Sequence, residues 1–237
     1  MGFFDFLPSI ARYEDDANTV QRMNLRHEMI IAPLVQEIAG ARVLDLAAHD
    51  GRWSYAFATA GAREVVGIEG RADLVARFDC FPANAARDRV SLICDDIFDA
   101  MEKRVARGET FDVIGILGIF YHIMDHFRLL RLAAALKPRL MIVDSEFAAR
   151  PGAVILMSRE RTDKDINAIP QIAGQARAVV GIPSPKALES MADALDLSCT
   201  WLDWQEIPEE YRKPVADYYR VGEKRRGTCL LHHNPVL

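Results

Sequence analysis

Short apolar segments alternate with longer amphipathic segments along most of this chain. The apolar segments have the length of buried strands and are found at residues 41–45, 64–69, 89–94, 111–117 and 140–144. The segments between them have a helical repeat and are found at residues 71–87, 97–107 and 127–136. A further amphipathic helix, residues 18–39, precedes the first strand and is ended by Gly40. Strands that alternate with helices predict an α/β fold with a mostly parallel sheet.

The regular alternation of predicted strands and helices ends in the second half of the chain. Residues 147–182 are long and mixed and carry a charge cluster at 159–165, which predicts a lid-like insertion on the substrate side or a solvated helix face. Ser184 as N-cap and Pro185 at the first helical position then predict another helix. Two final strands are expected to form an antiparallel pair, at residues 198–204 and 227–232.

Chain length and hydropathy divide the 237 residues into two parts. Residues 1–40 form an N-terminal docking segment and entry helix, and residues 41–237 form one α/β domain. The apolar start, Met1 to Pro8, has no basic residues and no small-residue cleavage site, so it does not read as a secretory signal. We expect it to cover a cleft or a partner subunit, which favours a homodimer. No apolar run approaches the roughly 20 residues that a membrane span needs.

Charge and cysteine usage narrow the function classes. The net charge of −5 and the pI near 5.7 disfavour a nucleic-acid partner, because phosphate binding usually needs a basic surface. The four cysteines are scattered without a C-x-x-C pair, so we expect a reduced, cytoplasmic protein without a cysteine zinc site.

The most informative segment lies between the first two strands. The first strand ends on Asp45, the chain turns through small residues to Gly51, and the second strand ends on Glu69. This pattern predicts the first βαβ unit of a nucleotide-binding sheet, with Glu69 placed to bind ribose hydroxyls. A dinucleotide pyrophosphate needs G-x-G-x-x-G, whereas the glycine positions here read Ala47, His49 and Gly51. Asp45 could alternatively be a helix cap with no ligand.

The segment resembles motif I of the class I S-adenosylmethionine (SAM) methyltransferases, Asp-x-Gly-x-Gly-x-Gly, with only the last glycine retained. The resemblance implies a Rossmann-like, seven-stranded methyltransferase sheet, mostly parallel with an antiparallel C-terminal strand and helices on both faces. It also implies SAM as the cofactor. SAM carries no phosphate, so a small side chain such as Ala47 is tolerable at a glycine position, while His49 is the least usual substitution.

Two further segments are similar to other motifs of that family. Asp96 aligns with the acid after the third strand that accepts the adenine amino group, with Asp95 one residue away and Ile97 beside the adenine ring. Asp96 could also be only a helix cap. Gly118, in the segment Leu117 to His122, resembles the fourth motif, whose backbone lines the sulfonium pocket.

Candidate catalytic residues follow the fourth and fifth strands. Tyr121, His122, Asp144 and Glu146 lie where the carboxyl ends of parallel strands place ligands. A hydroxyl nucleophile needs help in losing its proton, and His122 is the leading base because imidazole titrates near neutrality. Asp144 and Glu146 could orient it, bind the hydroxyl or act as base. A purely structural His122 is an equal alternative.

A metal could assist instead. Asp125 and His126 add oxygen and nitrogen ligands to this group, enough for Mg²⁺ to lower the pKa of a hydroxyl. The acid patterns of the metal-dependent sugar and catechol methyltransferases are not reproduced closely. Magnesium is therefore allowed but not favoured, and no metal ligand is assigned.

Three functions follow. The first is a SAM-dependent O-methyltransferase for a hydroxyl of a small polar acceptor, such as a saccharide. The segments Leu-Gly-x-x-Tyr-His and Pro-Ser are similar to those of sugar O-methyltransferases, including the type that acts on mycobacterial methylmannose polysaccharide. They also occur in the tRNA wobble-uridine carboxymethyltransferase family, which gives the second hypothesis. The third is a non-catalytic protein that binds SAM or a nucleotide such as NAD.

Overall fold

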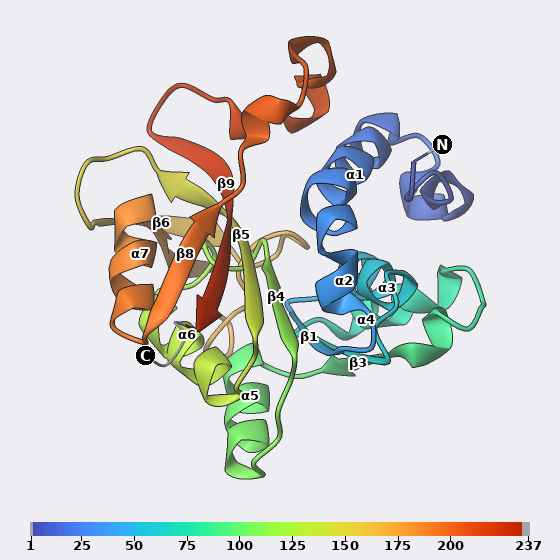
Figure 1. Cartoon of the computed structure of the whole chain (residues 1–237), viewed down its shortest axis with the longest axis horizontal. Helices are drawn as coiled ribbons and strands as arrows, with labels where there is room; N and C mark the ends of the chain where they lie inside the picture. The colour runs from blue at the N-terminus through green and yellow to red at the C-terminus, as the bar shows by residue number, and fades with distance from the viewer. Residues whose placement is uncertain (1, 234–237) are drawn as a thin grey trace.

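A seven-stranded sheet forms the centre of the computed structural model, which describes residues 2–233 (Figure 1). Its strands occur in the order β3-β2-β1-β4-β5-β9-β8, and β9 alone runs opposite to the other six. The strand bounds are β1 (Arg42–Leu46), β2 (Glu64–Glu69), β3 (Val90–Cys94), β4 (Val113–Leu117), β5 (Leu140–Ala148), β8 (Leu197–Trp201) and β9 (Lys224–His233). The predicted sheet, with its antiparallel C-terminal strand, is confirmed.

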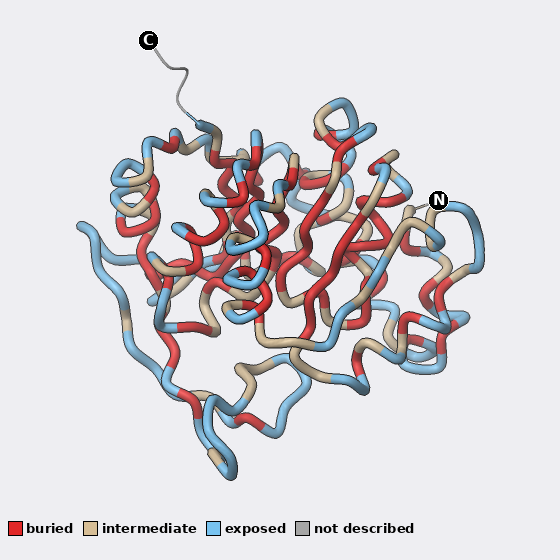
Figure 2. The backbone as a smooth tube through the Cα atoms, turned by 90° about the horizontal axis from the view of Figure 1, so that it is seen from below, coloured by how far each residue is buried: buried red, intermediate tan, exposed pale blue. Residues whose placement is uncertain are grey.

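Helices cover both faces of the sheet (Figure 1). One face packs under α1 (Ala17–Ile30), α2 (Val35–Ile38) and α3 (Arg52–Thr59), and the other under α5 (Ile97–Ala106), α6 (His126–Ala135) and α7 (Pro185–Asp193). Successive strand residues point to opposite faces. Val43 accordingly belongs to the first hydrophobic cluster and Leu44 to the second. Figure 2 shows the buried residues concentrated along these central elements.

Helix ends follow local capping chemistry. The Ser184 hydroxyl accepts a hydrogen bond from Ala187 N at 3.1 Å, and Pro185 opens α7, as predicted. Asp16 caps α1 in the same way, accepting from Thr19 N at 3.0 Å.

Two predicted helices end earlier than expected, both at prolines. The entry helix stops at Ile30, and a 3₁₀ turn containing Pro33 separates it from the short α2. The helix expected at residues 71–87 ends at Cys80, after α4 (Ala72–Ala76) and a 3₁₀ turn. Phe81 precedes Pro82 and is extended, as steric conflict with the proline ring requires.

The insertion forms a hairpin that stands apart from the main sheet. β6 (Ile155–Arg161) and β7 (Arg177–Pro183) pair antiparallel, from Ile155 with Pro183 to Arg161 with Arg177. The charge cluster at residues 159–165 lies on β6 and the following turn, so the alternative of a solvated helix face is wrong. The loop between the two strands returns toward the carboxyl edge of the main sheet, where it lines a cavity.

The apolar N-terminal segment packs on its own chain. Phe4 and Leu7 are fully buried in the hydrophobic cluster that includes α1 and α3, and Phe3 stacks on His27 with ring centroids 4.2 Å apart. These side chains are therefore covered without a partner subunit, and the homodimer stays a prediction without their support. No helix within residues 2–233 is long and apolar enough to cross a membrane.

Candidate functional site

A cavity of about 340 Å³ opens at the carboxyl ends of β1, β2 and β4. Most of the residues predicted to bind cofactor or substrate line it, namely Ala47, Glu69, Asp95, Asp96, Ile97, Gly118, Tyr121 and His122. Asp45, Gly51, Asp144 and Glu146 lie outside its lining. Parallel strands end at one edge of the sheet, which brings residues from distant parts of the sequence to this one cavity.

The turn after β1 keeps a glycine-type backbone although two of its glycines are replaced. Ala47 and His49 have φ of 56° and 55°, and Gly51 has φ of 82°. This left-handed conformation is energetically unfavourable for residues other than glycine. Its presence at all three positions therefore supports their alignment with the motif I glycines. Gly51 is fixed by packing as well, since a Cβ there would lie 2.5 Å from Phe78 Cδ2.

Asp45, on β1, is bonded to the helix that follows this turn. Its side chain is buried and accepts a hydrogen bond from the Ser54 hydroxyl at 2.6 Å. Burial raises the pKa of Asp45 to about 7. The carboxyl therefore ties β1 to α3.

Glu69, at the end of β2, faces the cavity with both oxygens already oriented. Oε2 accepts from His49 N at 2.9 Å and Oε1 from Arg71 N at 3.0 Å. Burial raises the pKa of this carboxyl. Each oxygen keeps a second lone pair, so the carboxylate can still accept from two neighbouring hydroxyls.

Asp96 is both a helix cap and a cavity residue. Its Oδ1 accepts from Phe98 N at 2.8 Å and from Asp99 N at 3.2 Å, so the capping interpretation is correct. No described residue bonds to Oδ2. Asp95 is engaged differently, in an ion pair with Lys103 at 2.7 Å.

The N-terminal segment holds the motif I turn in place, which the sequence did not indicate. Asp50 is buried, accepts a hydrogen bond from the Tyr13 hydroxyl and pairs with Arg52 Nε at 2.7 Å. Burial alone would raise the pKa of Asp50, but the Arg52 charge holds it well below its usual range. Tyr13 and Arg52 both line the cavity.

His122 forms a pair with Glu160, a residue of the insertion that sequence reasoning missed. The imidazole Nδ1 lies 2.6 Å from Glu160 Oε2, which also accepts from Ala168 N at 3.1 Å. Burial would raise the pKa of Glu160, but the bond from His122 outweighs it and lowers the pKa. A carboxylate only accepts hydrogen bonds, so Nδ1 carries a proton, and in the neutral imidazole Nε2 is then the acceptor.

The loop from residue 165 to 171 closes one side of the same cavity. Arg71 Nη2 holds it by donating to the carbonyl oxygens of Thr162, Lys164 and Asn167 at 3.2, 3.0 and 3.0 Å. Ile169 packs so closely on Gly70 that a Cβ there would lie 2.8 Å from its Cδ1. The insertion is thereby connected to the Glu69 end of the cavity.

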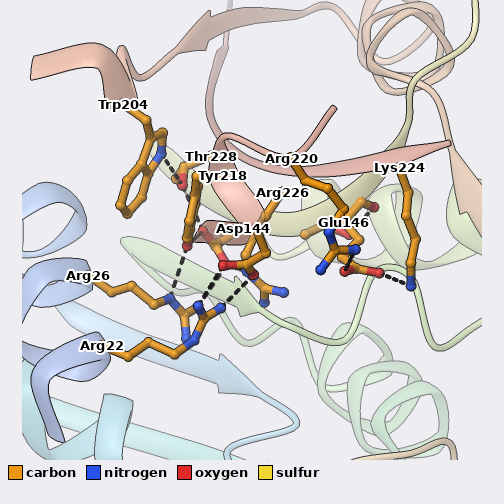
Figure 3. Close-up of polar contacts among 12 residues, drawn as sticks. Arg22, Arg26, Asp144, Glu146, Trp204, Tyr218, Arg220, Lys224, Arg226 and Thr228 are labelled. Carbon is orange, nitrogen blue, oxygen red and sulfur yellow. Dashed lines mark hydrogen bonds and ion pairs between the residues drawn. The ribbon is translucent and has the colours of Figure 1, made fainter. Parts of the chain in front are cut away.

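Asp144 lies at the centre of a buried polar cluster behind the cavity (Figure 3). Oδ1 accepts from Arg26 Nη2 at 2.7 Å and Arg226 Nε at 2.8 Å, and Oδ2 accepts from the hydroxyls of Tyr218 at 2.6 Å and Thr228 at 2.7 Å. Burial would raise the pKa of Asp144, but the two arginines lower it to about 2. Four donors use its lone pairs, so a role as base or as ligand of a substrate hydroxyl does not fit.

Glu146 is also paired away from the cavity, with Arg220 at 3.2 Å and with Lys224 (Figure 3). The proposed magnesium ligands do not converge either. Asp125 has an exposed side chain, and the buried His126 ring lies 3.0 Å from the Gly181 carbonyl oxygen. Among residues 2–233, no group of three or more His, Cys, Asp or Glu side chains is arranged to hold a metal ion.

Several solved structures have a fold similar to that of this chain. No protein-family model matches the sequence, and no curated protein matches it. The N-terminal domain of EvdMO1, crystallised in the presence of SAH and D-fucose, has a TM-score of 0.62 at 17% identity, over 93% of this chain and 84% of that domain. A putative SAM-dependent methyltransferase from Listeria monocytogenes has a TM-score of 0.62 at 11% identity, over 92% of this chain and 100% of its own.

The DhpI-SAM-HEP complex is similar over 96% of this chain and 94% of its own, with a TM-score of 0.54 at 19% identity. The chain has the fold of the class I SAM-dependent methyltransferases. In this methyltransferase fold the Glu69, Asp96 and Gly118 positions border one cavity, as the motifs predicted. The sequence patterns did not identify Tyr13, Arg52, Arg71 or Glu160 as residues of the site. For Arg26, the only signal was its position on the entry helix.

Proposed function

We propose that this chain binds SAM and transfers its methyl group to a hydroxyl of a small polar acceptor of the saccharide class. The observation that carries the proposal is the His122–Glu160 pair, 2.6 Å apart, in the cavity that Glu69 and the motif I turn also line. A cofactor site and an oriented base in one cavity are what an O-methyltransferase needs.

The described residues fit SAM. Glu69 has lone pairs left for the two ribose hydroxyls, and the free Oδ2 of Asp96 can accept from an adenine amino group. Ile97 and Phe98 supply apolar surface in the cavity for the adenine ring. Ala47 and His49, in the left-handed turn, line the cavity and would hold the methionine end of the cofactor. When bound, SAM supplies an electrophilic methyl group on a sulfonium leaving group.

His122 acts as the general base. The acceptor oxygen would take the methyl group from the bound cofactor, whose sulfur would keep the electron pair of the sulfur–methyl bond. The hydroxyl proton passes to Nε2 of His122, and Glu160 stabilises the resulting imidazolium through Nδ1. Water then takes the proton from the imidazolium.

Two observations support the acceptor class. The Leu117–His122 segment is similar to sugar O-methyltransferases, and the EvdMO1 domain of the same fold was crystallised in the presence of D-fucose. A hydroxyl of a sugar is a poor nucleophile at neutral pH, so it requires the oriented base that the cavity contains.

Methyl transfer from labelled SAM to a panel of sugars, sugar acids and sugar phosphates tests the proposal, with bulk tRNA as a separate acceptor. We expect a sugar-class acceptor, and a loss of about 10²–10⁴-fold in kcat for His122→Asn with unchanged SAH affinity. His233→Asn, an exposed histidine near the end of β9, is the matched control. Binding of SAH without methylation of any acceptor supports the binding-only alternative, and methylation of tRNA alone supports the second hypothesis.

A further inference from the structure

We propose that the acceptor carries an anionic group, a carboxylate or a phosphate, and that Arg26 binds it, with the positive charge of Arg226 behind the cavity lining. This inference rests on the proposed function and specifies its substrate. It starts from the buried cluster behind the cavity, which contains more positive than negative charge (Figure 3).

The cluster contains three arginines and two aspartates. Arg22 pairs with Asp217 at 2.6 Å, while Arg26 and Arg226 share one oxygen of Asp144. Only 6% of Arg26 and 7% of Arg226 is exposed, and Asp144 is fully buried. A buried cluster with one uncompensated positive charge is costly, and a bound monoanion would neutralise it.

The donors of Arg26 are only partly used. Nε donates to the Tyr218 hydroxyl at 3.0 Å and Nη2 to Asp144, but the contact of Nη1 is the Met23 sulfur at 4.0 Å. A thioether is a weak acceptor. Arg26 and Met23 both line the cavity, so a nearly buried guanidinium there has one nitrogen whose partner is only a weak sulfur acceptor.

Arg26 is also held rigidly. Its guanidinium lies 4.9 Å from the Trp53 ring centroid, and Asp144 and Tyr218 fix the other side. Arg226 adds a second positive charge, 5.4 Å from the ring centroid of Tyr121, which lines the cavity. Because these donors are already fixed, an anion can bind to them without a further loss of side-chain conformational entropy. The protein as a whole has a net charge of −5, so this positive site is a local feature.

The anion could come from the acceptor or from the carboxylate of SAM. The cofactor carboxylate is accompanied by its own ammonium group, and this pair adds no net charge. An acceptor carboxylate or phosphate does neutralise the cluster. We therefore assign the site to the acceptor, which places its anionic group near Arg26 and its reacting hydroxyl near His122.

Calorimetric titration of inorganic phosphate into SAH-saturated protein tests the assignment. We expect binding that is weakened at least tenfold by Arg26→Met. Arg107→Met, which removes an exposed arginine at the C-terminal end of α5, should leave it unchanged. Arg26→Lys keeps the buried charge in case the methionine variant does not fold, and it should weaken phosphate at least threefold.

A second titration separates the two sources of the anion. SAH and 5′-methylthioadenosine, which lacks the amino-acid part, should each bind Arg26→Met as tightly as the wild type. Loss of SAH affinity with unchanged methylthioadenosine affinity would assign Arg26 to the cofactor and overturn the proposal. Equal phosphate affinity in wild type and a folded Arg26 variant, or no phosphate binding, would also overturn it. If SAH fails to bind wild type, the proposed function fails, and phosphate titration of the unloaded protein still decides the anion site.

Discussion

Replacing Asp144 by Asn should destabilise the protein strongly, because the carboxylate serves structure. The substitution preserves side-chain volume but removes the charge that faces Arg26 and Arg226. The new amide NH₂ also meets N–H donors instead of accepting from them. Two guanidiniums are then left buried without their shared counter-ion.

The expected loss can be worked out from the contacts. Removing one partner of a buried ion pair costs about 3–5 kcal/mol. The pKa of Asp144, lowered from 3.8 to about 2, corresponds to roughly 2.5 kcal/mol that favours the ionised form in the folded state. A lowered pKa contributes stability that is present above the unfolded pKa and lost as the pH falls through about 2. At neutral pH we therefore expect a loss of about 3–4 kcal/mol, or roughly 10 °C in Tm.

Urea unfolding at pH 7, followed by tryptophan fluorescence, measures this loss. Asp163→Asn removes a carboxylate from an exposed pair with Arg161 and should leave the stability unchanged within error. Phosphate should restore more stability to Asp144→Asn than to wild type, because it replaces the missing negative charge. A loss below about 1 kcal/mol at Asp144 would refute the structural role of the buried pairs.

Three other substitutions test separate parts of the structure. Glu160→Gln should lower kcat about 10–100-fold at unchanged SAH affinity, because the 2.6 Å charge-assisted bond orients the base; an equal kcat in steady-state assays contradicts that role. Ala47→Gly should stabilise the fold by about 0.5–1 kcal/mol in urea unfolding by relieving a φ of 56°, whereas the neighbouring Ala48→Gly should destabilise it; the reverse order would disprove strain in the turn. Burial lowers the pKa of His27 to about 4, so between pH 6.5 and 4 the unfolded chain takes up a proton that the folded protein does not. Relative to wild type, His27→Phe should therefore gain about 1–2 kcal/mol as the pH falls through that range, after a discount for solvent screening of the part-exposed ring. The opposite effect of Asp45 is present in both proteins and cancels, and parallel stability curves would contradict the prediction.

The sequence predicted those features that depend on local pattern and sheet topology. Glu69 and Asp96 end or follow strands that are parallel neighbours, so topology alone brings their side chains to one edge. The alignment of Ala47 and His49 with glycine positions was also informative, because the fold imposes the same left-handed backbone on them. Pro33 could have marked the early end of the entry helix.

Sequence patterns could not predict which side chains pair when they are far apart along the chain. Asp144 was predicted to be catalytic because the expected strand ended on it, whereas β5 continues to Ala148 and the partner Arg26, 118 residues away, is selected by three-dimensional packing. Glu160 lies in an insertion whose charge cluster gives no sign of which side chain turns inward. A residue's position at a strand end predicts its location, whereas its role depends on partners that only the folded chain supplies.

Calorimetric titration of S-adenosylhomocysteine, with NAD as the competing ligand, tests the central claim most directly. The account predicts micromolar binding of S-adenosylhomocysteine, weakened at least tenfold by Glu69→Gln, and no binding of NAD. Glu109→Gln, which removes a carboxylate paired with Arg107 near the opposite edge of the sheet, should leave the affinity unchanged. Failure to bind S-adenosylhomocysteine, or tight binding of NAD, would contradict the assignment of the cavity to SAM.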